Sequence, residues 1–152
     1  MRSLPFPVLL VGVLMFALAG CGGGDEEEQP TSVSKVAYVK RADEICKETE
    51  KRQRKLLLQF QRENKGAGNS PRVLEEMVTA AALPPLEQQV EELAKLPPPD
   101  KEAAKAKAYM AAVEKAVRDI RMEPGTLFAE PGAFTKALEL APEFGFKTCR
   151  GA

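Results

Sequence analysis

In residues 34–64, apolar side chains recur at the spacing of one long helix. This periodicity constrains the fold more than any other feature of the sequence. Every seventh position is apolar or partly apolar: Val39, Cys46, Gln53 and Phe60. The positions three or four residues away are filled by Tyr38, Ala42, Ile45, Thr49, Leu56 and Leu57. Because an α-helix turns once in about 3.6 residues, these side chains share one face. The pattern therefore predicts a long amphipathic helix.

The opposite face of this segment is rich in Lys and Arg. Residues 35–65 hold ten basic and five acidic side chains, whereas residues 71–96 hold two basic and five acidic ones. The short link between the two segments makes them antiparallel neighbours, so their opposite charges favour this arrangement. We interpret the basic face as a solvated helix surface, with a lipid-binding or polyanion-binding face as the alternative.

Helix start and stop signals divide the first half of the chain. Ser34 is the expected N-cap of the first helix, and two glycines in residues 65–69 end it. Ser70 is the expected N-cap of the next helix, with Pro71 at its first position. Further along, the pair Pro84-Pro85 predicts a sharp kink or two helices in near register.

The second half of the chain is punctuated in the same way. Residues 97–99 are three prolines that stop a helix, and Asp100 is the expected N-cap of a helix over residues 101–122. A last short helix is expected over residues 133–140. These segments predict an all-α fold, a small antiparallel bundle of four or five helices.

The N-terminus has the features of a signal peptide. Arg2 is the only charged side chain before Asp25, and the apolar run that follows it ends in small residues. The run is shorter than the roughly 20 residues of a membrane-spanning helix. Residues 1–20 are therefore predicted to be a secretory signal.

The run closes with Leu18-Ala19-Gly20-Cys21, which resembles the lipobox of bacterial lipoproteins. The resemblance implies that Leu18, Ala19 and Gly20 are recognised by a signal peptidase that cleaves after Gly20. It also implies a diacylglyceryl lipid, with acyl chains such as palmitate, on the thiol of Cys21. An uncleaved membrane anchor and a secreted protein with an incidental cysteine are the alternatives.

Three parts follow from this interpretation. Residues 1–20 are the signal peptide, residues 21–33 are the lipidated Cys21 with a flexible acidic tether, and residues 34–152 are the helical domain. The tether contains three glycines and four consecutive acids, a composition typical of a solvated spacer. Two acyl chains hold a protein on a bilayer where one is marginal. The expected location is the extracytoplasmic face of the cell membrane.

The three cysteines divide into one anchor and one pair. If Cys21 carries lipid, Cys46 and Cys149 remain in an exported chain, and an even pair in an oxidising compartment indicates a disulfide. We expect a structural disulfide between them. Two reduced thiols and a redox-active dithiol are the alternatives, and the chain has no C-x-x-C spacing to favour the second.

Composition excludes several functions. The chain has no His, which is the commonest metal ligand and general base. Its 22 basic and 22 acidic residues argue against a nucleic-acid partner, which requires excess positive charge. It has no phosphate-binding glycine loop and no G-x-S-x-G motif. We therefore predict no enzyme activity, no metal site, and no cofactor besides the lipid on Cys21.

Three segments together resemble a group of small helical lipoproteins of Actinobacteria. They are Tyr38-Val39-Lys40-Arg41-Ala42-Asp43-Glu44-Ile45-Cys46, Leu93-x-x-Leu96-Pro97-x-Pro99 and Ala141-x-x-Phe144-Gly145-Phe146-x-x-Cys149. The resemblance implies a secreted, lipid-anchored helical domain closed by a disulfide. The group has no assigned activity, so the resemblance implies no catalytic residue.

A few side chains have both a structural and a functional interpretation. Asp43 is expected to cap or pair with groups that are local in the sequence, and the alternative is an anchor for a ligand or partner. The methionines are expected to fill the core, and the alternative is an apolar cavity lined by Met77, Met110 and Met122. The late phenylalanines are expected to close one end of the bundle, with an exposed patch as the alternative: Phe128, Phe134, Phe144 and Phe146.

These observations favour a membrane-anchored, non-catalytic binding or interaction module at the cell envelope. Its expected partners are membrane lipid, through the Cys21 anchor, and an envelope protein. The alternative is a carrier of a small molecule or lipid with an apolar cavity inside the bundle. A continuous internal cavity would favour the carrier, whereas a filled core with an exposed apolar patch would favour the interaction module.

Overall fold

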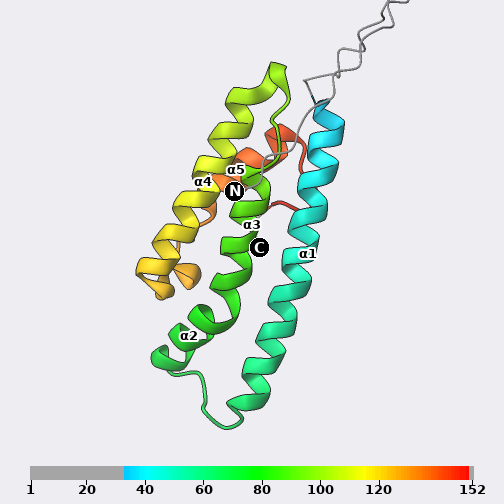
Figure 1. Ribbon diagram of the computed structural model, residues 1–152. Coiled ribbons are helices and arrows are strands. Elements are labelled where there is room, and N and C mark those ends of the chain that lie inside the picture. The colour runs from blue at the N-terminus through cyan, green and yellow to red at the C-terminus, as the bar shows by residue number, and fades with distance from the viewer. Residues whose placement is uncertain (1–32, 151–152) are drawn as a thin grey trace, which may run out of the picture.

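The computed structural model describes residues 33–150, which form a helical bundle (Figure 1). Its α-helices are α1 (Lys35–Glu63), α2 (Pro71–Met77), α3 (Leu83–Ala94), α4 (Ala103–Met122) and α5 (Thr135–Phe144). A π-helical segment, η1 (Val78–Ala82), joins α2 to α3, and 3-10 turns occupy η2 (Asp100–Glu102) and η3 (Pro124–Phe128). The described residues contain no strand, which confirms the all-α prediction.

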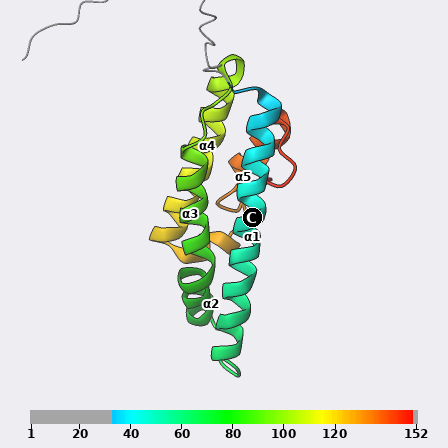
Figure 2. The same cartoon turned by 45° about the vertical axis from the view of Figure 1, so that its right-hand side comes forward.

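The long helices run antiparallel, with α3 packed against both α1 and α4 (Figure 1, Figure 2). The last helix, α5, packs against α4, and the segment after it returns to the upper half of α1 (Figure 2). The bundle has four helices if α2, η1 and α3 are taken as one bent helix, and five if α2 and α3 are counted separately. Both counts agree with the predicted architecture.

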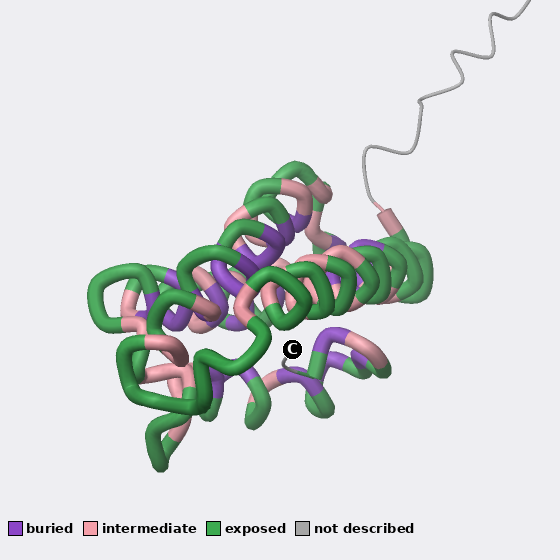
Figure 3. Tube along the Cα trace, turned by 90° about the horizontal axis from the view of Figure 1, so that it is seen from below, coloured by how far each residue is buried: buried purple, intermediate pink, exposed green. Residues whose placement is uncertain are grey.

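The core lies between the helices and extends into the C-terminal segment. Figure 3 shows the buried stretches on the inward sides of the helices and the exposed stretches outside. Among residues 33–150, the buried core side chains run from Tyr38 to Cys149. In α1 the buried residues all lie in the N-terminal half: Tyr38, Ala42, Ile45, Cys46 and Thr49. The C-terminal half of the predicted stripe is only partly covered.

The proline pair is accommodated by a π-helical turn. Pro84 and Pro85 have no N–H, so they cannot donate to the carbonyl groups four residues earlier. The backbone widens before them, and the N–H of Leu83 donates to the carbonyl of Val78, five residues back. The helix then continues with prolines in its first turn, where no N–H is required. The predicted kink is therefore present as a bend between α2 and α3 (Figure 1).

Two of the expected helix caps are confirmed and one is wrong. Ser34 Oγ accepts the N–H of Ala37 at 3.2 Å, and Ser70 Oγ accepts the N–H of Val73 at 3.4 Å. Asp100 is not an N-cap. It opens the η2 turn, in which the N–H of Glu102 donates to the carbonyl of Pro99 at 3.0 Å. This tight turn moves the start of α4 to Ala103, beyond the reach of the Asp100 carboxylate as its cap.

The last helix differs from its expected bounds. Residues 133–140 were the predicted span, whereas α5 covers Thr135–Phe144 and includes Pro142. It ends at Gly145, whose φ of +99° is left-handed and suits glycine. The N–H of Gly145 donates to the carbonyl of Ala141, which caps the helix and turns the chain toward α1.

Candidate functional site

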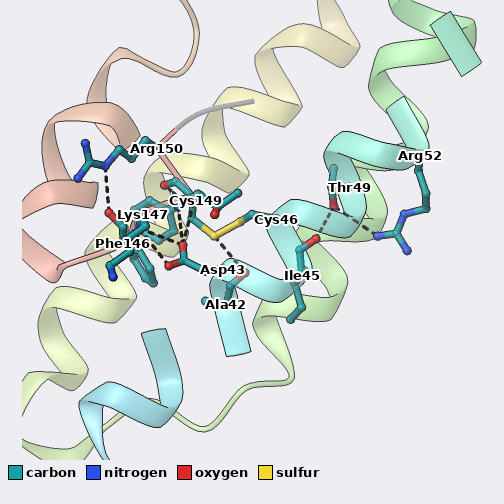
Figure 4. The surroundings of a disulfide bond; sticks show 12 residues. Ala42, Asp43, Ile45, Cys46, Thr49, Arg52, Phe146, Lys147, Cys149 and Arg150 are labelled. Carbon is teal, nitrogen blue, oxygen red and sulfur yellow. Dashed lines mark hydrogen bonds between the residues drawn. A yellow bond between two sulfur atoms is a disulfide. The ribbon is translucent and has the colours of Figure 1, made fainter. Parts of the chain in front are cut away.

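A disulfide joins α1 to the C-terminal segment (Figure 4). Cys46 and Cys149 are bonded with their Cα atoms 5.4 Å apart, and both residues are buried. Cys46 lies on the inward stripe of α1, as its spacing predicted. The expected disulfide is confirmed, and these two residues are not a reduced pair.

Asp43 lies one helical turn before Cys46 and binds the backbone of the same segment. Its Oδ1 accepts the N–H groups of Lys147 at 3.1 Å, Thr148 at 2.8 Å and Cys149 at 3.1 Å (Figure 4). Carboxylate oxygens make stronger hydrogen bonds with amides than neutral acceptors do. Asp43 therefore has the expected capping role, but the expectation of a local partner is wrong, because the capped N–H groups lie 104 to 106 positions away in the sequence.

A third interaction comes from α4. The hydroxyl of Tyr109 donates a hydrogen bond of 2.8 Å to the buried carbonyl of Cys149. Burial raises the pKa of Tyr109 far above its ordinary value of 10.0, so the hydroxyl stays a donor. We call these residues the tail clamp: Asp43, Cys46, Tyr109 and Cys149. The inward direction of Tyr109 was predicted, but nothing in the sequence identifies its partner.

Aromatic rings pack around the tail clamp. Phe144 and Phe146 stack with ring centroids 4.9 Å apart, and Tyr38 meets Phe144 edge-on at 5.5 Å. Tyr109 contacts Phe146 at 4.6 Å. The expected phenylalanine group is thus only partly formed. Phe134 is buried without a ring contact among residues 33–150, and Phe128 is 52% exposed.

A cleft of about 480 Å³ lies beside the tail clamp, between the N-terminal half of α1 and residues 144–148. We call it the tail cleft. Four lysines and two acids line it together with apolar side chains: Lys35, Lys40, Lys47, Lys147, Asp43, Glu44, Val36, Val39 and Phe144. Lys35 pairs with Glu102 at 2.8 Å. The other three lysines have no ion-pair partner within residues 33–150, so the tail cleft favours an anionic group.

A second cleft, of about 550 Å³, lies between α4, residues 123–133 and α5. We call it the outer cleft. Its apolar lining includes Met122, Ala129 and Pro131, and its charged side chains include both signs. Met122 is 85% exposed, and Phe128 is exposed in the neighbouring turn. This surface presents apolar area that the described domain does not cover.

The methionines do not gather around one cavity. Met110 lines a hollow of about 240 Å³ with Leu93 and Leu96, while Met77 is half-buried on α2. Met122 lines the outer cleft instead. Core filling therefore describes Met110 in part, since this side chain packs against the core while partly buried, and it does not describe Met77 or Met122. The carrier alternative, which needs an apolar cavity inside the bundle, stays a prediction.

Among residues 33–150, no group of three or more His, Cys, Asp or Glu side chains gathers as a metal site would require. The pKa of surface Glu48 is lowered by its hydrogen bond from Lys51, and that of Lys136 is raised by its hydrogen bond to Glu139. Both are ion pairs along a helix surface. The absence of an enzyme activity and of a cofactor stays a prediction.

The predicted lipobox, Leu18-Ala19-Gly20-Cys21, lies outside the described residues, so the lipid anchor stays a prediction as well. Within residues 33–150, no helix has both the length and the apolar character needed to cross a membrane. No protein-family model, curated protein or solved structure matches this chain significantly. The resemblance to actinobacterial lipoproteins is therefore untested.

Proposed function

We propose that this chain is an exported lipoprotein and that its helical domain is a non-catalytic binding module of the cell envelope. Acyl chains on Cys21 would hold it at the extracytoplasmic face of the cell membrane. One observation carries the proposal: the Leu18–Cys21 motif precedes a domain whose other two cysteines form a buried disulfide. Disulfides persist in oxidising compartments, so the bond supports export independently of the N-terminal motif.

The outer cleft is the candidate site for an envelope protein. Met122 lies on it with most of its side chain exposed, and Phe128 is exposed nearby. Exposed methionines and aromatic side chains are typical of protein-binding surfaces. The two signs of charge around this cleft suit the polar rim of an interface rather than a polyanion. The partner expected here is a protein segment with apolar side chains.

Mass spectrometry of the protein from its native host tests the anchor. The expected N-terminal peptide begins at Cys21 and carries a diacylglyceryl group, and the variant Cys21→Ser lacks both the lipid and the cleavage. A mature chain that still begins with residues before Cys21 would contradict the proposal. A soluble, unmodified chain would do so too.

Crosslinking in intact cells tests the binding site. A photoreactive amino acid at position 122 is expected to give a discrete crosslinked product, since Met122 lies on the outer cleft. The control carries the same group at position 95, where Lys95 is exposed and lies on neither named cleft. The outer cleft is not the partner site if both positions give the same products, or if position 122 gives none.

A further inference from the structure

The exposed side of α1 carries a row of basic side chains that we call the basic face: Lys40, Lys47, Lys51, Arg54, Lys55 and Arg62. Each residue turns a helix by roughly 100°, which places these six within roughly a quarter of its circumference. The buried residues of α1, centred near Ile45 and Thr49, lie on the opposite side. The basic face is therefore the most outward part of the helix.

Most of this charge has no partner in the domain. Lys51 pairs with Glu48 at 2.6 Å. The other five basic side chains have no carboxylate within ion-pair distance among residues 33–150. One nearby acid, Glu44, pairs with Arg41 at 3.2 Å, and the Asp43 carboxylate binds the C-terminal segment. From residue 47 to residue 62 there are six basic and two acidic side chains.

Apolar side chains are interspersed with these charges. Val36 is 79% exposed and Leu58 is 51% exposed, and helical spacing places both on the basic face. The hollow around Leu58 is about 470 Å³ and is lined only by α1 residues. Lys47 lines both that hollow and the tail cleft, so the surface is continuous along α1. In the described domain nothing else covers it.

We infer that the basic face docks on an anionic phospholipid bilayer, with α1 lying along the membrane surface. Anionic headgroups attract Lys and Arg near the surface, and apolar side chains among them can enter the boundary with the acyl chains. A soluble polyanion would use the charges but would leave Val36 and Leu58 in water. The two apolar side chains therefore favour a bilayer.

The inference rests on the proposed function for the place where docking occurs. Lys35 lies fourteen positions after Cys21, and an extended chain of that length reaches at most about 50 Å. The start of α1 can thus lie on the same membrane that holds the acyl chains. The outer cleft belongs to α4 and α5, so docking through α1 leaves it free for a protein partner.

Vesicle binding tests the inference with the mature chain, residues 21–152, carrying Cys21→Ser. This chain keeps all the residues that the structure describes, 33–150, together with the acidic tether. We expect it to sediment with vesicles of phosphatidylcholine and phosphatidylglycerol, but not with phosphatidylcholine alone. Added salt should weaken the binding. The inference is overturned if the chain does not bind the anionic vesicles. The assay uses an unlipidated chain, so its result does not depend on whether Cys21 is lipidated in cells.

Matched variants separate the basic face from general attraction. The variant Lys47→Gln/Arg54→Gln/Lys55→Gln/Arg62→Gln is expected to bind anionic vesicles at least about tenfold more weakly. The control Lys95→Gln/Lys101→Gln/Lys105→Gln/Lys107→Gln removes the same charge from exposed lysines outside α1. It should stay within about twofold of the unchanged chain. Equal losses in the two variants contradict docking through α1.

A soluble polymer of glycerol phosphate distinguishes a bilayer from a polyanion. Leu58→Ser is expected to weaken binding to anionic vesicles and to leave binding to the polymer unchanged, because only a bilayer offers an apolar phase. A chain that binds the polymer but not the vesicles has a polyanion face, which overturns the inference. Circular dichroism and an intact disulfide confirm that each variant is folded.

Discussion

The carboxylate of Asp43 accepts the backbone N–H of Cys149 at 3.1 Å, across 106 positions of sequence. This hydrogen bond joins the same two segments as the disulfide, whose Cys46 lies one helical turn later on α1. Covalent and polar links thus hold the same short segment to the same helix face. This double attachment explains how a C-terminal segment without its own helix stays part of the core.

Opening the disulfide should destabilise the domain strongly. The bond closes a separation of 103 residues, for which the chain-entropy relation gives about 4–5 kcal/mol. We expect the double variant Cys46→Ala/Cys149→Ala to lose an amount of this order in urea unfolding. A reducing agent should lower the midpoint of the unchanged chain and leave that of the variant as it was. A variant as stable as the oxidised chain would show that the bond contributes little.

Asp43→Asn is expected to lower the free energy of unfolding by about 1–2 kcal/mol. The loss is smaller than for a fully buried charged group, because Asp43 is half-exposed and solvent screens its charge. Asn keeps one acceptor oxygen but loses the charge and presents an NH₂ group to amide donors. The matched control is Glu44→Gln, whose surface pair with Arg41 should matter by less than about 0.5 kcal/mol. Equal effects of the two substitutions would refute this role of Asp43.

Local signals in the sequence were sufficient for the helices and several of their ends. Ser34 and Ser70 each cap an amide three residues later, so their roles can be predicted from the neighbouring sequence. The disulfide could be predicted because two cysteines remain once Cys21 is assigned to the lipid, and because an exported chain is expected in an oxidising compartment. The bend at Pro84-Pro85 was also predictable, whereas its π-helical form depends on how the preceding turn packs.

Long-range polar contacts were not predictable in the same way. The sequence indicates a polar role for Asp43, but its partners are main-chain amides, which every residue except proline carries and which leave no pattern in the sequence. Tyr109 was placed on the inward face, but its acceptor is again a main-chain group. Asp100 shows the reverse case. Its residue type suits a cap, but the tight η2 turn of the backbone decided otherwise.

Gly145→Ala should cost about 1–2 kcal/mol through backbone strain alone. Gly145 has φ +99°, which L-residues with a side chain rarely adopt, and a Cβ there would meet Lys35 Cε at an unstrained 4.0 Å. Gly125→Ala is the matched control, because that site has open space and no positive φ. Thermal unfolding of both variants should show a lower midpoint for Gly145→Ala only. A similar shift in both would contradict the argument from strain.

Tyr109→Phe should destabilise the domain by about 1–2 kcal/mol, because the buried carbonyl of Cys149 would lose its hydrogen bond. Tyr38→Phe is a useful comparison. Tyr38 is equally buried, but its hydroxyl makes no hydrogen bond within residues 33–150, so its loss should cost less. Urea unfolding of the two variants measures the difference. A larger effect of Tyr38→Phe would show that ring packing, not this hydrogen bond, dominates.

Alkaline pH should unfold the protein through these same side chains. Burial raises the pKa of both Tyr38 and Tyr109 above the ordinary value of 10.0, so the folded state keeps protons that the unfolded state releases. The contribution of these two groups to the free energy of unfolding is complete below pH 10. It declines as the pH rises further, by up to about 1.4 kcal/mol per pH unit for each group.

The two tyrosines are the only ones in the chain, which makes the measurement direct. Tyrosinate absorbance should remain low above pH 10 and rise together with the loss of helical circular dichroism. In Tyr109→Phe the stability should fall less steeply with pH above 10, because one raised pKa has been removed. Tyrosinate that forms near pH 10 while the helices remain intact would contradict the burial of these two side chains. That outcome would also remove the Tyr109 hydrogen bond from the tail clamp.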